Sequence, residues 1–139
     1  MPYSVRPMEL NYFAGFFDGE GCIMISSRKK GRPYHTLDVA VTLTRRSVLE
    51  DFQVAFGGRV YSATREKTYY KPKWQWIIGG DNAMKFLEQI KPFLRLKRQE
   101  AELGIEFQKA KESYHSSLFR EARRAIEEAQ YLAMKGLKK

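Results

Sequence analysis

The sequence has a single cysteine, Cys22, among its 139 residues. One thiol cannot form an internal disulfide, so disulfide-rich secreted domains are excluded and a reducing compartment is favoured. No apolar run approaches the roughly 18 residues that a membrane-spanning helix needs. The first residues, MPYSVRPMELN, lack the charged, apolar and small-residue blocks of a signal peptide. These absences predict an intracellular protein that does not span a membrane.

Acidic residues are also few relative to basic ones. The chain has 25 Lys and Arg against 16 Asp and Glu, a formal net charge of +9. Most of the excess lies in residues 22–75, whereas residues 1–21 contain Arg6 against three acids. This balance favours a polyanionic partner such as nucleic acid. A solvated basic face without a partner is the open alternative from charge alone.

What the chain does have is apolar and aromatic residues, at 43% and 14%. That content predicts one folded domain with a core rather than disorder. Residues 9–19, ELNYFAGFFDG, indicate a helix that ends at its last glycine. It is apolar nearly all round, and Gly15 and Gly19 lie four residues apart on one face. Glycines at this spacing allow another helix to approach closely.

The middle of the chain alternates between apolar and polar residues, as half-buried strands do. Strands are predicted over residues 22–30, 36–44, 59–67 and 71–78. Ser47 with Glu50 is expected to cap a helix that runs to Phe56, and Asp81 or Asn82 to cap one over 83–91. Helical patterns follow from Leu94 onwards. The predicted order is α-β-β-α-β-β-α plus extra helix, an α+β fold whose sheet has one polar, basic face.

Residues 12–21, YFAGFFDGEG, closely resemble the signature motif of LAGLIDADG homing endonucleases, and the motif itself corresponds to FAGFFDGEG at 13–21. The turn at Phe56–Val60, the strand at Trp74–Trp76 and the segment Lys91–Lys97 strengthen the likeness. Together they cover roughly residues 8–103. The resemblance divides the chain into a DNA-binding and catalytic core at 1–103 and a C-terminal helical extension at 104–139.

The resemblance implies an αββαββα half-unit with a saddle-shaped antiparallel sheet in the DNA major groove. Because one motif is present, it implies a homodimer on a pseudo-palindromic double-stranded site. The dimer interface is then expected to include Tyr12, Phe13, Gly15, Phe16 and Gly19. The implied activity is site-specific double-strand cleavage, as in intron homing, in a prokaryotic or phage cytoplasm or in an organelle.

The family binds its divalent ion through the second acid of the motif, which here is Glu20. A carboxylate oxygen suits Mg²⁺ or Mn²⁺, and the resemblance adds the main-chain carbonyl of Gly19 as a ligand. Metal ions shared with the symmetry mate activate water and stabilise the leaving oxygen of a phosphodiester. Lys97 matches the family's basic residue near the active site, where it stabilises transition-state charge or orients water. Arg95 and Arg98 are adjacent alternatives to it.

Strand alternation assigns a set of side chains to the groove-facing surface of the sheet. Arg is suited to guanine, Gln to adenine and Asp to cytosine. The expected DNA-binding residues are Cys22, Met24, Ser26, Arg28, Lys30, Arg32, Thr36, Asp38, Ala40, Thr42, Arg59, Tyr61, Arg65, Lys71, Lys73, Gln75 and Ile77. Arg32 is assigned to the phosphates together with Lys29 and Lys67.

One departure from the family pattern matters. A polar residue often stands near the end of the second strand and positions water, but the best-matching position here is Leu43. Leu cannot hydrogen-bond, so Thr44 or Arg45 substitutes, or cleavage is slow or lost. Two alternatives to the endonuclease therefore stay open: a DNA-binding regulator that does not cut, and an RNA-intron maturase of the same fold.

Overall fold

The computed structural model of the chain describes residues 7–26, 35–64, 71–113 and 120–138. The elements follow in the order α1 (Pro7–Glu20), β1 (Gly21–Ser26), β2 (Thr36–Leu43), α2 (Arg46–Phe56), β3 (Arg59–Ser62), β4 (Trp74–Gly79), α3 (Gly80–Ile90), the 3-10 turn η1 (Lys91–Phe93), α4 (Arg98–Ser113) and α5 (Arg120–Leu137). The predicted α+β order is thus confirmed, with α4 and α5 as the additional helices.

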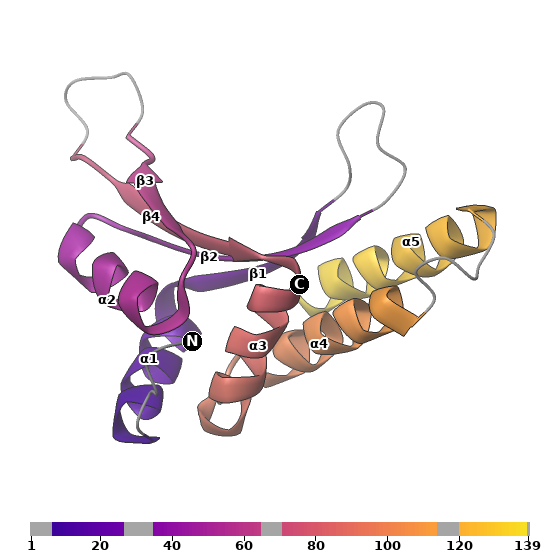
Figure 1. The fold of residues 1–139 in the computed structure, drawn as a ribbon, viewed down its shortest axis with the longest axis horizontal. Coiled ribbons are helices and arrows are strands. Elements are labelled where there is room, and N and C mark those ends of the chain that lie inside the picture. The colour runs from indigo at the N-terminus through magenta and orange to yellow at the C-terminus, as the bar shows by residue number, and fades with distance from the viewer. Residues whose placement is uncertain (1–6, 27–34, 65–70, 114–119, 139) are drawn as a thin grey trace.

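The strands form one antiparallel sheet in the order β1-β2-β4-β3. The two hairpins, β1–β2 and β3–β4, therefore meet at the central pair of β2 and β4. Helices α1, α2 and α3 all lie on the same side of this sheet, while the other side is left without a described helix (Figure 1). The sheet curves, and both hairpins rise at its sides, which gives it a saddle shape.

The alternation of the sequence decides which face of the sheet is buried. Leu37, Val39 and Val41 of β2 are fully buried, and so is Trp76 of β4. Val41 pairs with Trp76 across the two strands. The indole N–H of Trp76 donates to the carbonyl of Gly57 at 2.7 Å, which satisfies its one polar group inside the core. The helix-covered face is therefore the apolar one, as predicted.

Helix α1 packs into this core through one side only. The ring centroids of Phe13 and Phe52 lie 4.8 Å apart, and those of Phe17 and Phe86 lie 5.3 Å apart. Ala14 and Phe17 are fully buried. Along the opposite side, Tyr12 is 52% exposed, and Gly15 and Gly19 are exposed as well. The helix is apolar nearly all round, yet the side that bears Tyr12, Gly15 and Gly19 is exposed in the described chain.

Two predicted helix caps are wrong. The N-cap of α2 is Arg45 rather than Ser47, and it makes no side-chain cap hydrogen bond. A tertiary contact lies at the start of α2, where the Arg46 guanidinium is 4.5 Å from the Trp74 ring centroid. Likewise, α3 begins after Gly79, and Asp81 lies inside its first turn. The Asp81 carboxylate pairs there with Lys85, at 3.1 Å.

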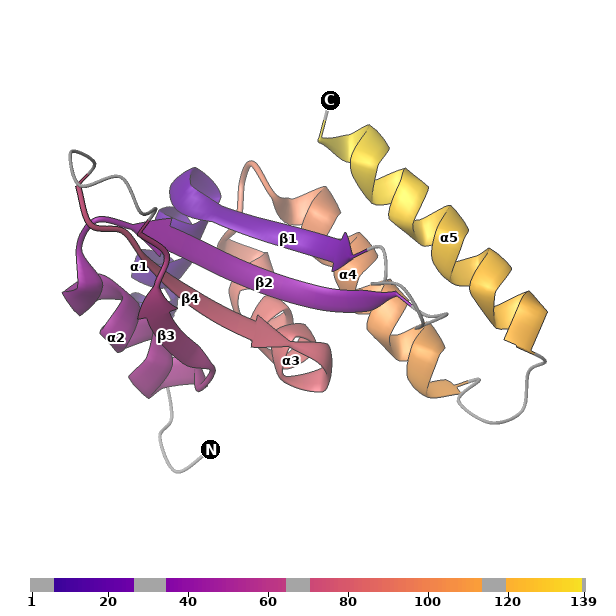
Figure 2. The ribbon, with the colours of Figure 1, turned by 90° about the horizontal axis from the view of Figure 1, so that it is seen from above.

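The C-terminal helices extend the domain sideways. Helix α4 runs without a break through the predicted boundary at residue 103, and its buried Ala101, Ile105 and Phe107 join the same core as the sheet. Helix α5 lies along the outer edge of β1 and against α4 (Figure 2). Among the described residues, no helix is long and apolar enough to cross a membrane.

Candidate nucleic-acid interface and metal site

The C-terminal end of α1 is joined to the turn that precedes α4. The Asp18 carboxylate accepts hydrogen bonds from the main-chain N–H groups of Arg95, Leu96 and Lys97, at 2.8, 3.2 and 3.1 Å. In return, the Lys97 ammonium donates to the main-chain carbonyl of Asp18 at 2.5 Å. A cation at the C-terminal end of a helix is favourable for the helix dipole. Asp18 thus makes these hydrogen bonds within its own chain.

Glu20 is the last residue of α1, two positions beyond the carbonyl that Lys97 contacts. Its side chain is exposed, and among the described residues it makes no hydrogen bond or ion pair. Gly19 beside it is exposed too. The two predicted metal residues and the predicted catalytic lysine therefore meet at one end of α1, where β1 begins.

A single copy of this end offers few metal ligands. No group of three or more His, Cys, Asp or Glu side chains that could hold a metal ion occurs among the residues the structure describes. Mg²⁺ prefers octahedral oxygen coordination and often takes one or two carboxylates together with water and substrate phosphates. One exposed carboxylate with an adjacent main-chain carbonyl fits this donor chemistry and supplies part of such a coordination shell.

The residues predicted for the dimer interface separate into two groups. Tyr12, Gly15 and Gly19 lie along the exposed stripe of α1, with Phe16 half-buried at its border. A Cβ atom added at Gly15 or Gly19 would have no heavy atom of the described chain within 4 Å, apart from its own helix backbone and chain neighbours. Phe13 is a correction. Its side chain is only 6% exposed and packs edge to face on Phe52 and Phe56, so it belongs to the core.

The sheet face opposite the helices bears the predicted DNA-binding side chains. One row crosses three strands, because Tyr61 pairs with Gln75 and Gln75 pairs with Thr42. The Tyr61 hydroxyl donates to the Gln75 amide oxygen, and the Gln75 amide nitrogen donates to the Thr42 hydroxyl at 3.1 Å. The Gln75 amide is thereby fixed in one orientation on the open face of the sheet.

The next row places Arg59, Ile77, Ala40 and Cys22 side by side on the same face. Ala40 is a second correction, since it is 3% exposed and its small side chain is covered by its longer cross-strand neighbours. Farther along β2, the Asp38 carboxylate accepts from the hydroxyls of Ser26 and Thr36, at 3.3 and 3.4 Å. The remaining predicted residues on or beside this face are Met24, which is half-buried, and Lys71 and Lys73, which are exposed.

Some predicted contacts lie outside the described residues, namely Arg28, Lys30, Arg32 and Arg65. Leu43, the departure from the family pattern, pairs with Trp74 and packs at the border of the core. It therefore faces the helices, while its neighbour Thr42 carries a hydroxyl on the open face.

Sequence reasoning missed one polar cluster altogether. The Glu127 carboxylate is fully buried between α5, α4 and the start of β2, where it contacts His35, Lys111 and Arg123. His35 and Glu127 are 92 residues apart, so no local pattern links them. The one available signal was the close spacing of Arg123 and Glu127 on a helix.

The chain is similar to known proteins over most of its length. It is 29% identical over 106 residues to DNA endonuclease I-CvuI of Chlorella vulgaris, a match that covers 71% of this chain and 63% of that protein. The chain thus spans less than two thirds of that relative's length. A crystal structure of I-CvuI in complex with its target superposes with a TM-score of 0.74 at 22% identity, covering 94% of this chain and 82% of that one.

An archaeal intron-encoded homing endonuclease, I-Vdi141I, complexed with DNA, has the same fold. Its TM-score is 0.72 at 16% identity, with coverage of 94% of this chain and 84% of that one. The sequence model of the LAGLIDADG-like domain family matches residues 7–91 of this chain. These residues include α1, the whole sheet, α2 and α3, which is more than half of the chain. The chain therefore belongs to the family of LAGLIDADG-like domains.

Proposed function

We propose that this protein is a site-specific double-strand DNA endonuclease of the homing type. It acts as a homodimer on a pseudo-palindromic site inside the cell, and it hydrolyses phosphodiester bonds with Mg²⁺ or Mn²⁺. The observation that carries the proposal is the position of Glu20. An exposed carboxylate follows an exposed glycine stripe on one helix and directly precedes the first strand of an open, polar sheet face.

The sheet face supports DNA as the substrate. An antiparallel sheet with one free face can enter the major groove of about 12 Å width and present side chains to base edges. Gln75, Asp38 and Arg59 supply three different hydrogen-bonding patterns on that face. The net charge of +9 supplies a sequence-independent attraction for the phosphates. The relative I-CvuI is described as a DNA endonuclease, in agreement with this substrate.

The glycine stripe supports the homodimer. Each helical glycine costs about 1 kcal/mol relative to alanine, and no atom of the described chain requires the absence of a side chain at Gly15 or Gly19. Close approach of a second helix explains both. Two-fold pairing of α1 brings a second Glu20 to the same end of the helix pair, which supplies the carboxylate that one chain lacks.

The residues of the site fit metal-assisted hydrolysis. A bound divalent ion supplies an activated water and stabilises charge on the leaving oxygen. Glu20 and the carbonyl of Gly19 would hold it. Lys97 is fixed by its own backbone and ammonium bonds to Asp18, and an ammonium has three donors. It therefore retains donors for a phosphate oxygen and stabilises the negative charge that develops there.

The decisive experiment begins with selection of bound and cleaved sites from a random duplex library in Mg²⁺. On a selected site, Glu20→Gln is expected to keep binding and lose cleavage, because the amide retains the shape but not the anionic oxygen. Glu50→Gln is the matched control, since Glu50 is an exposed acid on α2. Continued Mg²⁺-dependent cutting by the Glu20→Gln protein would remove the mechanism.

A binding protein that does not cut is the second candidate, and Leu43 is the observation that favours it. Its side chain packs at the border of the core beside Trp74, so it orients no water. This candidate predicts salt-sensitive binding of a selected site with no nicking in Mg²⁺ or Mn²⁺. A maturase is distinguished by stimulation of intron splicing by the purified protein.

A further inference from the structure

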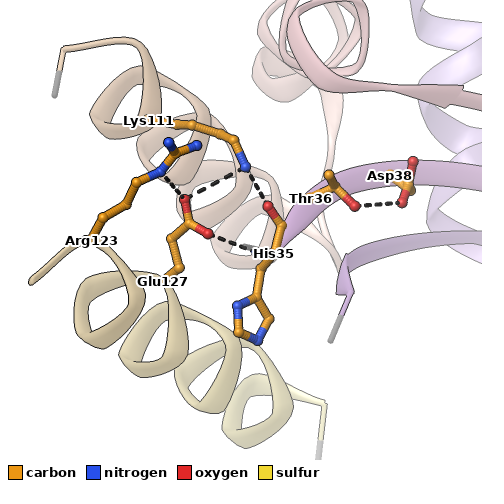
Figure 3. A network of polar contacts seen from close by, with 6 residues as sticks. All are labelled: His35, Thr36, Asp38, Lys111, Arg123 and Glu127. Atoms are coloured by element: carbon orange, nitrogen blue, oxygen red, sulfur yellow. Dashed lines mark hydrogen bonds and ion pairs between the residues drawn. The ribbon is translucent and has the colours of Figure 1, made fainter. Parts of the chain in front are cut away.

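The Glu127 carboxylate is the most deeply buried charge of the described chain. Its side chain is 0% exposed, although it lies on the amphipathic helix α5. The oxygen Oε2 lies 3.5 Å from the Lys111 ammonium and 3.3 Å from Nε of Arg123. The other oxygen, Oε1, accepts from the main-chain N–H of His35 at 2.7 Å. Figure 3 shows these groups converging at the junction of three elements.

The cluster binds both main-chain polar groups of His35, its N–H and its carbonyl. Lys111, from α4, donates to the main-chain carbonyl of His35, while Glu127 accepts from its N–H. The imidazole Nε2 lies 3.1 Å from the Glu128 carboxylate, and the ring packs 5.1 Å from Tyr131. His35 directly precedes β2. The contacts therefore fix the residue immediately before β2, where the second strand of the β1–β2 hairpin begins.

Helix α5 is also tied to the first strand. The Lys138 ammonium donates to the main-chain carbonyl of Ile23 in β1 and lies 3.5 Å from the Cys22 sulfur. Figure 2 shows α5 on the side of the sheet where β1 is the edge strand. Helix α5 and the residue that follows it thus contact both strands of the hairpin, just before the start of β2 at His35 and in the middle of β1 at Ile23.

The end of the hairpin that contacts the Glu127 cluster, where β1 ends and β2 begins, lies far from α1. Strand β1 begins directly after Glu20 and runs away from it for six residues, which is about 17 Å between the first and last at roughly 3.3 Å per residue. DNA rises about 3.4 Å per base pair. In the proposed homodimer, with α1 at the two-fold axis and β1 following the groove, this length corresponds to roughly five base pairs. That placement assigns the hairpin end to the outer part of each half-site.

We propose that the Glu127 cluster is a brace that sets specificity at the outer base pairs of the half-site, and this rests on the proposed DNA-binding function. A buried carboxylate with two cations gives little net stability compared with apolar packing, and its best-attested use is to specify one arrangement of the elements it joins. Here it specifies the position of His35 relative to α5. Glu127 is a positioning residue, because it acts on DNA through the hairpin.

The test compares base preference at every position of a selected site. Glu127→Gln keeps an acceptor for the His35 N–H but removes the negative charge that lies beside Lys111 and Arg123. Discrimination at the outer base pairs is expected to fall roughly 2- to 30-fold, the range in which distant substitutions change coupling. Discrimination near the centre of the site is expected to stay unchanged. Glu106→Gln, an exposed acid on α4, is the matched control.

A charge-balanced variant separates positioning from a general loss of stability. Glu127→Gln combined with Lys111→Met removes one charge of each sign and also removes the bond to the His35 carbonyl. We expect it to unfold cooperatively and still lose outer discrimination. If either the single or the double variant folds and its base preference is unchanged at every position of the site, the proposed brace is overturned.

Hydrogen exchange of the unaltered protein gives a second readout that needs no variant and no DNA. The amides of α5 and of the hairpin residues Ile25, Leu37 and Val39 are expected to exchange through one common opening. Exchange of α5 with much lower protection, while the hairpin amides stay fully protected, would also overturn the proposal. If no DNA site is selected at all, the proposed function fails. Hydrogen exchange then tests only whether the Glu127 cluster couples α5 to the hairpin.

Discussion

The carboxylate of Asp18 accepts a hydrogen bond at 2.8 Å from the main-chain N–H of Arg95, which is 77 residues away in the sequence. Two further N–H groups of the same turn converge on this carboxylate. The last turn of α1, which leads to Glu20, is thereby joined to the segment that carries Lys97. Asp18 thereby holds the two proposed catalytic residues, Glu20 and Lys97, in fixed relative positions.

Replacement of Asp18 by Asn is therefore expected to affect both stability and activity. The amide keeps one accepting oxygen for three N–H donors and loses its charge, and hydrogen bonds to charged groups contribute about 1.5–3 kcal/mol each. We expect the free energy of unfolding in urea to fall by roughly that amount. Cleavage of a selected site should slow while binding persists, because Lys97 loses its fixed position. Asp51→Asn, on the exposed side of α2, should change neither quantity.

The exposed glycines give a prediction in which the protomer and the dimer respond with opposite sign. Alanine at Gly15 or Gly19 finds open space in the described chain, and it improves helix propensity by roughly 1 kcal/mol. The isolated protomer should become more stable in denaturant at low concentration. The homodimer should dissociate more readily, because a methyl group separates the paired helices.

Sedimentation equilibrium of Gly15→Ala and Gly19→Ala measures the association constant directly. Gly136→Ala is the control, since this glycine also lies in a helix with open space around it. It is expected to leave association unchanged. Glycine-to-alanine variants that dimerise as tightly as the unaltered protein would place the interface away from α1.

Strand alternation was sufficient to predict both faces of the sheet. In β2, Leu37, Val39 and Val41 are buried, and the intervening Asp38 and Thr42 face outward. Even the short β3, whose apolar side is weak, follows the predicted phase because Val60 pairs with Trp76. A period of two leaves only two choices for a strand, and one apolar residue in each pair decides between them.

Helix α1 was harder to orient, because Tyr12 and Phe13 are neighbours of similar size and apolarity. The choice between them is made by Phe52 and Phe56 of α2, which no local pattern connects to α1. The predicted caps failed for a related reason. The helix begins at Arg46, which contacts Trp74, and such a contact is of the same order as a local cap preference of about 1 kcal/mol, so the local pattern alone does not decide the first residue.

The orientation of the Gln75 amide leads to a prediction about base reading. Its oxygen accepts from Tyr61 and its nitrogen donates to Thr42, so the pattern presented to a base edge is fixed. Gln75→Ala should lose about 1–3 kcal/mol of discrimination at one base pair in each half-site. Tyr61→Phe should lose part of that discrimination at the same base pair, because the amide then turns more freely.

Binding selections on half-sites randomised one pair at a time locate the affected position. Gln53→Ala provides the control, because Gln53 lies on α2 and bonds to the carbonyl of Gly58. If Gln75→Ala and Tyr61→Phe alter different base pairs, the hydrogen bond between them does not govern recognition.

Salt dependence of binding tests the open sheet face and the homodimer together. Lys73 is exposed and lies two positions before Gln75, whose side chain is on that face. Each lost phosphate contact lowers the slope of log K against log salt by about 0.9 for B-DNA. In a homodimer, Lys73→Gln removes the contact twice, so the slope should fall by roughly two. A monomer bound to the same duplex would lose about one. Lys109→Gln should leave the slope unchanged, since this ammonium lies 3.6 Å from Glu88 among the helices, away from the open face.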